Sequence, residues 1–196
     1  EVSLLPPESH TALAPDLEQI EQVAKQLCLA KRPIFVVGGG AQHASSEVLR
    51  MAEMLQAPVT FFRSGKGVID ERHYLSQSFP AGHRLWADAD VVLAIGTRLK
   101  YQQMYWGLDK NLKILRIDID PTEINRISTP EIGIVADART ALEALLPLVE
   151  SHNIPRPSRT EELNYLKTEF QEAFEDKIAP QMGYLRVIRE ELPEDG

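Results

Sequence analysis

The sequence predicts a three-layer α/β/α fold in which helices cover both faces of a mostly parallel sheet. Short β-branched runs alternate with longer amphipathic segments along the chain, and the short runs are apolar at every position. A strand that is apolar throughout is buried on both faces, as in a parallel sheet covered by helices. Because crossovers between parallel strands are right-handed, the sheet is expected to be doubly wound and Rossmann-like, with FAD/NAD-binding-like topology.

An incoming linker is expected over residues 1–15, which contain three prolines and no periodicity. Asp16 and Gln19 then form a capping box that begins a helix. Pro33 ends the helical register and introduces a strand over 34–37. The expected core positions of the first helix recur at helical spacing: Ile20, Val23, Ala24 and Leu27.

The same alternation continues through the rest of the domain. Glycines at 38–40 form a turn before a helix over 45–56, and a short helix is expected at 121–126. A longer helix starts at Asp137, with its apolar residues in register as far as Val149. Four further strands are expected, at 59–62, 90–96, 113–120 and 132–135.

Beyond this domain, assigned to 16–150, a polar, proline-rich stretch over 151–160 indicates an outgoing linker. Residues 161–196 form a helical tail, in which Pro180 and Gly183 are expected to end the first helix before a short last one. The tail has no core of its own, so it must dock on this domain or belong to an absent neighbour.

Composition excludes several functions. The formal charge is −8, which disfavours binding to nucleic acid or to an anionic membrane surface. No apolar run approaches the roughly 20 residues needed to span a bilayer, and no signal segment is apparent. The single cysteine, Cys28, cannot form an internal disulfide and is expected to be a buried structural thiol, so we expect a cytoplasmic protein.

Ligands of an open parallel sheet bind where loops leave the carboxyl ends of the strands. Glycine lets backbone N–H groups approach a phosphate, Lys66 and Arg98 can neutralise a diphosphate, and a strand-end carboxylate can accept the hydroxyl protons of a ribose. These properties predict a cradle for an adenine dinucleotide or for ADP. Its residues follow successive strands: Gly38, Gly39, Gly40, Lys66, Gly96, Thr97, Arg98, Asp118, Asp120 and Asp137.

Structural interpretations of the same residues stay open. The glycines can form a tight strand-to-helix turn, Asp120 and Asp137 can cap helices, and Lys66 and Arg98 can be solvated surface charges. A standard NAD fingerprint is a poor match, because His43 occupies the third glycine position and no carboxylate ends the second strand. The pattern contains no catalytic constellation and no metal-ligand spacing.

Taken together, six stretches in order resemble the central domain of thiamine-diphosphate-dependent enzymes of the acetolactate synthase group. The resemblance covers about residues 15–150, and the end of the tail resembles the start of the family's third domain. The matching stretches are 30–41, 57–62, 65–73, 89–99, 115–126 and 135–145.

The resemblance implies a parent enzyme that binds thiamine diphosphate and magnesium and makes or breaks a C–C bond beside a carbonyl. Pyrimidine-binding and diphosphate-binding domains would flank this one in a homo-oligomer, and this chain alone would not be catalytic. The domain itself would bind FAD, bind ADP or CoA, or bind nothing. FAD-type contacts carried over from the family fall on Gly38, Gly39, Gly40, Thr60, Phe61, Gly96, Thr97, Arg98, Asp118, Ile119, Asp120 and Asp137.

The chain departs from the family pattern between 74 and 88, where flavin-binding relatives have a longer segment beside the isoalloxazine ring. An adenosine diphosphate half-site would survive that change more easily than a whole flavin site. Two alternatives also stay open: a free-standing nucleotide-binding or regulatory module, and an NAD-consuming enzyme of sirtuin-like topology. The latter usually carries a zinc module, which one cysteine cannot build.

Overall fold

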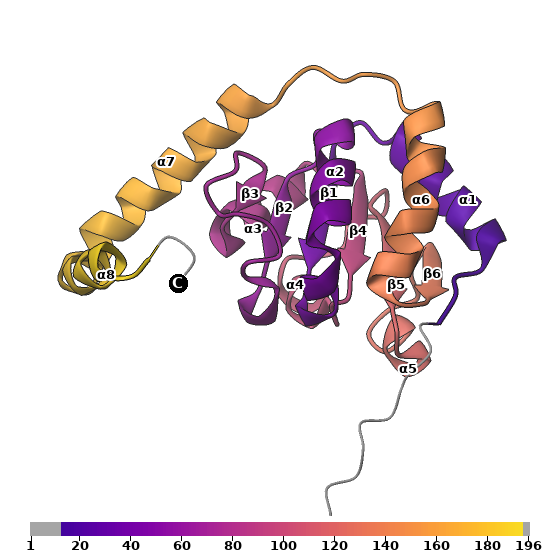
Figure 1. The fold of residues 1–196 in the computed structure, drawn as a ribbon, viewed down its shortest axis with the longest axis horizontal. Helices are drawn as coiled ribbons and strands as arrows, with labels where there is room; N and C mark the ends of the chain where they lie inside the picture. The colour runs from indigo at the N-terminus through magenta and orange to yellow at the C-terminus, as the bar shows by residue number, and fades with distance from the viewer. Residues whose placement is uncertain (1–12, 194–196) are drawn as a thin grey trace, which may run out of the picture.

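The computed structural model describes residues 13–193 and contains one six-stranded sheet with every pairing parallel. The strand order is β3-β2-β1-β4-β5-β6, the order of a doubly wound Rossmann sheet. The predicted fold class is therefore confirmed (Figure 1). The strands are β1 Pro33–Val37, β2 Val59–Phe61, β3 Ser76–Gln77, β4 Val91–Ile95, β5 Lys113–Asp118 and β6 Ile132–Val135.

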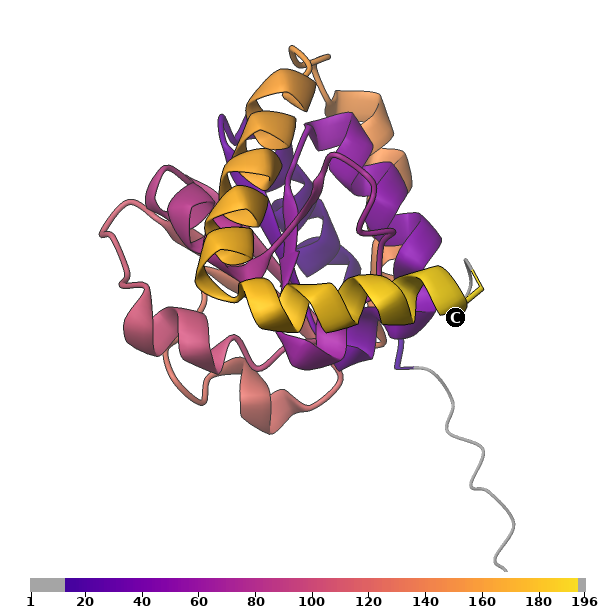
Figure 2. The ribbon, with the colours of Figure 1, turned by 90° about the vertical axis from the view of Figure 1, so that its left-hand side faces the viewer.

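Helices cover both faces of the sheet, as the fully buried strands β1 and β4 require. On one face α6 packs between α1 and α2, and α3 lies on the opposite face against β2 (Figures 1 and 2). The helices of the domain are α1 Leu17–Leu29, α2 Ser45–Leu55, α3 Phe79–Ala87, α4 Lys100–Tyr105, α5 Pro121–Ile124 and α6 Ala138–His152. Two 3-10 turns, η1 Gly39–Ala44 and η2 Arg63–Gly65, follow β1 and β2.

The helix boundaries follow from local chemistry. Asp16 caps α1 through a hydrogen bond from the Glu18 N–H, and α2 ends at Gln56, which adopts a left-handed conformation. The predicted core positions of α1 are all buried, with at most 4% of their surface exposed. Periodicity therefore identified both the helix and the face that packs inward.

The segment between β2 and β4 contains two elements that the sequence pattern did not predict. Strand β3 has only two residues, both polar, which pair with Val59 and Thr60 of β2. Helix α3 is capped by Ser78, whose hydroxyl accepts a hydrogen bond from the Ala81 N–H. Helix α4 also escaped prediction, because it has six residues and no apolar period.

After α6, the chain crosses the top of the sheet in Figure 1 and continues as α7 Thr160–Lys177 and α8 Ala179–Glu191. The stretch without secondary structure covers 153–159, slightly shorter than the predicted linker. The tail helix divides at Ile178, with Pro180 in the first turn of α8. The prediction that Gly183 also interrupts the helix is wrong: Gly183 lies inside α8, where an added side chain would meet no atom within 4 Å.

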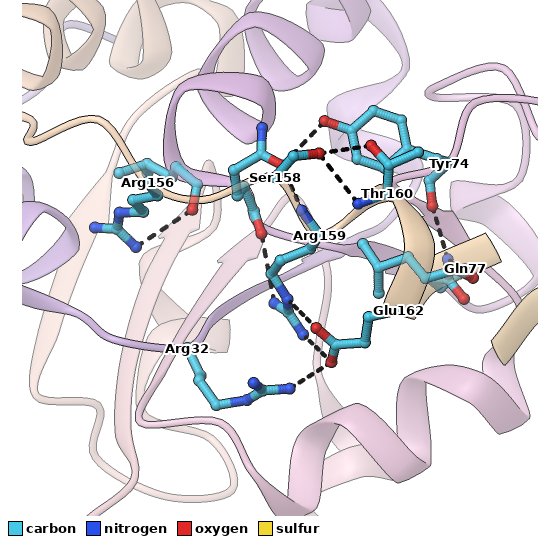
Figure 3. Close-up of polar contacts among 11 residues, drawn as sticks. Arg32, Tyr74, Gln77, Arg156, Ser158, Arg159, Thr160 and Glu162 are labelled. Atoms are coloured by element: carbon cyan, nitrogen blue, oxygen red, sulfur yellow. Dashed lines mark hydrogen bonds and ion pairs between the residues drawn. The ribbon is translucent and has the colours of Figure 1, made fainter. Parts of the chain in front are cut away.

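The segment 153–159 is held to the domain by side chains that cap two helices. The Arg156 guanidinium donates to the carbonyl oxygen of Leu27 near the end of α1 (2.8 Å) and to that of Leu55 at the end of α2 (3.2 Å). A cation at a helix C-terminus also interacts favourably with the helix dipole. Figure 3 shows Arg156 beside Arg159, whose backbone N–H donates to Gln56 Oε1 (3.1 Å).

No helix within residues 13–193 is both long and apolar enough to cross a membrane.

Candidate functional site

The loops that follow β1 and β4 touch through their glycines at the point where the strand order reverses. The Gly40 N–H donates to the Gly96 carbonyl oxygen at 3.1 Å. Gly96 has φ of +55°, and a Cβ on it would lie 2.5 Å from the Gly40 Cα atom. Because only glycine satisfies both conditions, the turn interpretation is correct for this contact, which places backbone at the usual ligand position of a doubly wound sheet.

On one side of this glycine contact lies an acidic cleft of about 400 Å³. Asp118 Oδ1 accepts from the Asp120 N–H (3.1 Å), Asp120 Oδ1 from Thr122, and Asp137 Oδ1 from Thr140 (3.1 Å). Asp120 and Asp137 therefore cap α5 and α6, which confirms the capping interpretation. Among the described residues, the Oδ2 atoms of Asp120 and Asp137 accept no hydrogen bond, so each has capacity for a ligand, whereas Asp118 Oδ2 faces the Arg116 guanidinium at 3.9 Å.

An exposed cation, Arg98, also lines the acidic cleft. Arg98 has 75% of its side chain exposed, and its Nε atom lies 3.6 Å from Glu123 Oε1. The hydrogen bonds from Thr122 lower the pKa of Asp120, so this carboxylate stays ionised at neutral pH. A neutral group with several hydroxyl or amino protons fits these carboxylates, whereas a phosphate surrounded by them would be repelled.

On the other side of the glycine contact lies a second, larger cleft of about 660 Å³, which Arg98 also lines. Its wall is aromatic: the Phe62 and Tyr101 rings stack at 5.6 Å, and Tyr101 lies 4.7 Å from Tyr105. Lys100 adds a second cation to this cleft. Both volumes lie within the usual range of small-molecule sites.

A buried arginine that the sequence pattern did not predict holds together two segments that border the clefts. Arg116 of β5 is completely buried and donates to the carbonyl oxygens of Glu123 (2.6 Å), Ile124 (2.9 Å) and Thr97 (3.0 Å). It therefore connects α5 with the loop after β4. Burial lowers the pKa of the guanidinium, and the nearby Asp118 opposes that shift. A charged residue inside a buried strand has no local sequence signal, because its partners are backbone atoms from other segments.

The structure brings most of the predicted site residues together and leaves four outside the clefts. Gly38 lies beneath them, with its N–H donating to the Ile95 carbonyl oxygen (3.0 Å). Thr60 is fully buried next to Gly82 of α3, and Phe61 and Lys66 line a separate pocket near α7. The predicted residues that line the two clefts are Gly39, Gly40, Gly96, Thr97, Arg98, Asp118, Ile119, Asp120 and Asp137.

Comparison with known families decides the identity of the domain. Residues 20–145, more than half of the chain, match the family model described as "Thiamine pyrophosphate enzyme, central domain". The chain belongs to this family. The predicted resemblance is thereby confirmed, and the alternatives of a free-standing nucleotide module and of a sirtuin-like enzyme are not favoured.

Relatives of this thiamine pyrophosphate enzyme central domain are much longer proteins. The acetolactate synthase isozyme 1 large subunit of Escherichia coli K12 is 31% identical over 165 residues, which cover 77% of this chain and 29% of that one. Glyoxylate carboligase of Escherichia coli O157:H7 is 32% identical over 143 residues, covering 67% and 24%. A probable 2-ketoarginine decarboxylase of Pseudomonas aeruginosa is 33% identical over 138 residues, covering 67% and 24%.

The fold comparison agrees with this assignment. An X-ray structure assigned to a thiamin diphosphate-dependent enzyme of Mycobacterium smegmatis superimposes with a TM-score of 0.62 at 22% identity, covering 79% of this chain and 32% of that one. At this identity the likeness establishes the fold alone. The central domain thus spans less than a third of these longer proteins.

Proposed function

We propose that this chain is the central domain of an acetolactate synthase-like or decarboxylase-like enzyme that uses thiamine diphosphate and magnesium. Such an enzyme, a lyase or transferase, makes or breaks a C–C bond next to a carbonyl group. The family match and the names of the relatives support this proposal. The chain itself would position a nucleotide and its neighbouring domains, and would not be catalytic on its own.

In this proposal the thiamine diphosphate and magnesium sites lie in parts of the parent enzyme outside this chain. Within the described residues, no group of three or more His, Cys, Asp or Glu side chains is placed to hold a metal ion. The diphosphate of thiamine needs such a metal site, so these residues do not fit the cofactor. When bound elsewhere in the parent, the cofactor would supply the carbanion chemistry.

We infer that the two clefts together hold one nucleotide. The carboxylates of Asp118, Asp120 and Asp137 would accept hydrogen bonds from the hydroxyl groups of a ribose and from the amino group of adenine, with Asp118 held in place by Arg116. The diphosphate would lie at the glycine contact beside Arg98, which lines both clefts. This orientation keeps the phosphates away from the three carboxylates.

The aromatic wall then distinguishes among the three nucleotides that the sequence left open. Beyond the diphosphate, FAD carries a planar ring, CoA carries a flexible chain and ADP carries nothing. Phe62, Tyr101 and Tyr105 offer faces on which a planar ring can stack, with 39%, 41% and 65% of each residue exposed. The observation that carries the nucleotide proposal is this junction of an acidic and an aromatic, cationic cleft over the glycine contact, and it favours FAD.

Calorimetric titration of the chain with FAD, ADP, CoA and thiamine diphosphate tests this function. We expect FAD to bind most tightly of the four. Arg98→Met should weaken the binding of both FAD and ADP by at least about tenfold, whereas Tyr105→Ala should weaken the binding of FAD alone. Arg50→Met is the matched control, because Arg50 is an exposed arginine of α2 that pairs with Glu150. Absence of saturable nucleotide binding would overturn the nucleotide site, and tight binding of thiamine diphosphate would overturn the assignment of that cofactor to other domains.

The remaining parts of the proposal concern the parent protein. Flanking pyrimidine-binding and diphosphate-binding domains would adjoin this one in a cytoplasmic homo-oligomer. Helix α8 is consistent with a neighbouring domain, because none of its residues is buried and it exposes an apolar surface. That surface consists of Tyr184, Leu185, Val187, Ile188 and Leu192.

A further inference from the structure

Two residues of the predicted nucleotide site, Phe61 from the family resemblance and Lys66 from the expected diphosphate cradle, line a different pocket, which the nucleotide proposal does not use. This pocket of about 360 Å³ lies between the β2–β3 edge of the sheet and the junction of α7 with α8. Figure 2 shows α8 running across the end of α7 in front of the domain. The apolar lining comes from both sides of the pocket: Phe61, Phe79, Phe170, Phe174, Ile178 and Met182.

The α7 wall of this pocket is fixed to the domain at its beginning. Glu162 accepts from Arg159 (2.8 Å) and from Arg32 (2.5 Å), as Figure 3 shows. Leu163 is fully buried, and its carbonyl oxygen accepts from Gln77 Nε2 of β3 (3.2 Å). Nearly two turns further along, Arg84 Nη1 of α3 donates to both carboxylate oxygens of Glu169, at 2.8 and 2.7 Å. Because α7 forms one wall, the pocket depends on the docking of α7 on the domain.

Two lysines give the pocket a positive charge. Lys167 donates through Nζ to the carbonyl oxygens of Glu71 (2.5 Å) and His73 (3.0 Å), which leaves one of its three donors. Among the described residues Lys167 has no carboxylate within ion-pair distance. Lys66 Nζ lies 3.4 Å from the Glu71 carboxylate, which offsets one of the two charges. A net positive charge remains beside phenylalanine rings.

We propose that this pocket binds a small carboxylic acid with an aromatic body. The carboxylate would accept a hydrogen bond from the third Lys167 donor and neutralise an ammonium whose hydrogen-bond partners within residues 13–193 are two carbonyl oxygens. The ring would pack among phenylalanines in edge-to-face or offset contacts. The volume is at the lower end of the range for ligand sites and is about half that of the aromatic cleft, so a small acid fits better than a nucleotide.

The test uses 3-phenylpropionate as the probe and 3-phenylpropanol as its uncharged analogue. Titration of the full chain, followed by calorimetry and by amide chemical shifts of α7, should show saturable binding of the acid and at least about tenfold weaker binding of the alcohol. Lys167→Met should weaken the binding of the acid by about tenfold or more and leave the binding of the alcohol unchanged. Lys110→Met, which removes an exposed lysine from the loop before β5, should change neither.

A gain-of-affinity variant makes the test independent of folding defects. Glu71→Gln removes the carboxylate that competes for Lys66 but keeps the backbone carbonyl that binds Lys167, so it should tighten binding of the acid severalfold. A misfolded variant cannot produce that result. The proposal is overturned if the acid shows no saturable binding up to about 10 mM, if the alcohol binds as tightly, or if Glu71→Gln weakens the acid.

Discussion

Replacement of the buried Arg116 by methionine should destabilise the chain far more than loss of any exposed arginine. Methionine fills much of the same apolar volume, so the change removes the hydrogen bonds of the guanidinium and its ion pair with Asp118 (3.9 Å) without leaving a large cavity. The three acceptors are backbone carbonyl oxygens, so they remain in the protein whatever side chain replaces Arg116. Two of them belong to buried residues, Glu123 and Ile124, whereas Thr97 is partly exposed, so water can replace its lost bond.

The magnitude follows from these contacts. The Glu123 carbonyl oxygen also accepts from the Arg126 N–H (3.4 Å) and so keeps a partner, whereas the buried Ile124 carbonyl oxygen loses its bond. A buried acceptor left without a partner costs about 1–3 kcal/mol. Removing the buried charge and its Nε atom, which has no hydrogen-bond partner in the described part of the chain, offsets part of this cost. We expect a net loss of about 2 kcal/mol in unfolding free energy and a fall in Tm of roughly 4–8 °C.

Urea denaturation and thermal melting monitored by circular dichroism measure this change. Arg50→Met is the control, because its exposed ion pair with Glu150 should contribute less than about 1 kcal/mol. Arg116→Lys keeps the charge but has a single nitrogen to share among the three carbonyls, so its stability should lie between those of the wild type and Arg116→Met. Equal losses for Arg116→Met and Arg50→Met would refute the argument.

Two further predictions concern the glycine contact and the docked tail. Gly96→Ala should lower the unfolding free energy by about 3 kcal/mol. Gly107 also has a positive φ (+86°), but among the described residues no atom lies within 4 Å of an added Cβ, so Gly107→Ala should lower it by about 1 kcal/mol. Equal losses in urea denaturation would contradict the steric contact at Gly96. Hydrogen bonds from Arg159 lower the pKa of Glu162 from 4.5 to about 2. Ionised Glu162 therefore stabilises the folded chain above pH 4.5, and this contribution is lost as the pH falls toward 2. With 41% of the side chain exposed, it should be about 1 kcal/mol, and a stability difference from Glu162→Gln that stays constant between pH 7 and 3.5 would refute it.

The parts of the fold that the sequence predicts are those whose environment determines residue type. Strands β1 and β4 are buried at every position, so they must be apolar, and the apolar run identifies them. Strand β3 follows a different rule, because Ser76 and Gln77 form a strand only through pairing with β2. Tertiary contacts of that kind leave no periodic signal in a single sequence.

The site shows the same division. Asp118, Asp120 and Asp137 could be placed together because parallel strands all end at one edge of the sheet. The same argument failed to bring Lys66 to them. Ser64 of the 3-10 turn after β2 lines the aromatic cleft, and the Lys66 carbonyl oxygen accepts from Gln42 Nε2 (3.0 Å), but Lys66 itself lines the pocket near α7. Strand order predicts where a loop starts, whereas its direction depends on packing that the sequence does not display.

The two ends of the strands have separate roles in this domain. Helix α2 starts beside the glycine contact and ends at the opposite edge of the sheet, where Arg156 and Arg159 bind the carbonyl oxygens of its last residues (Figure 1). The tail is therefore anchored at the edge where helices present their negative ends, which attract guanidinium groups. The carboxyl edge stays open for ligands, and α7 reaches it only at its far end, beside Phe170 and Phe174. Replacement of Arg156 and Arg159 should consequently undock α7 and open the pocket beside it, while the two nucleotide clefts stay intact.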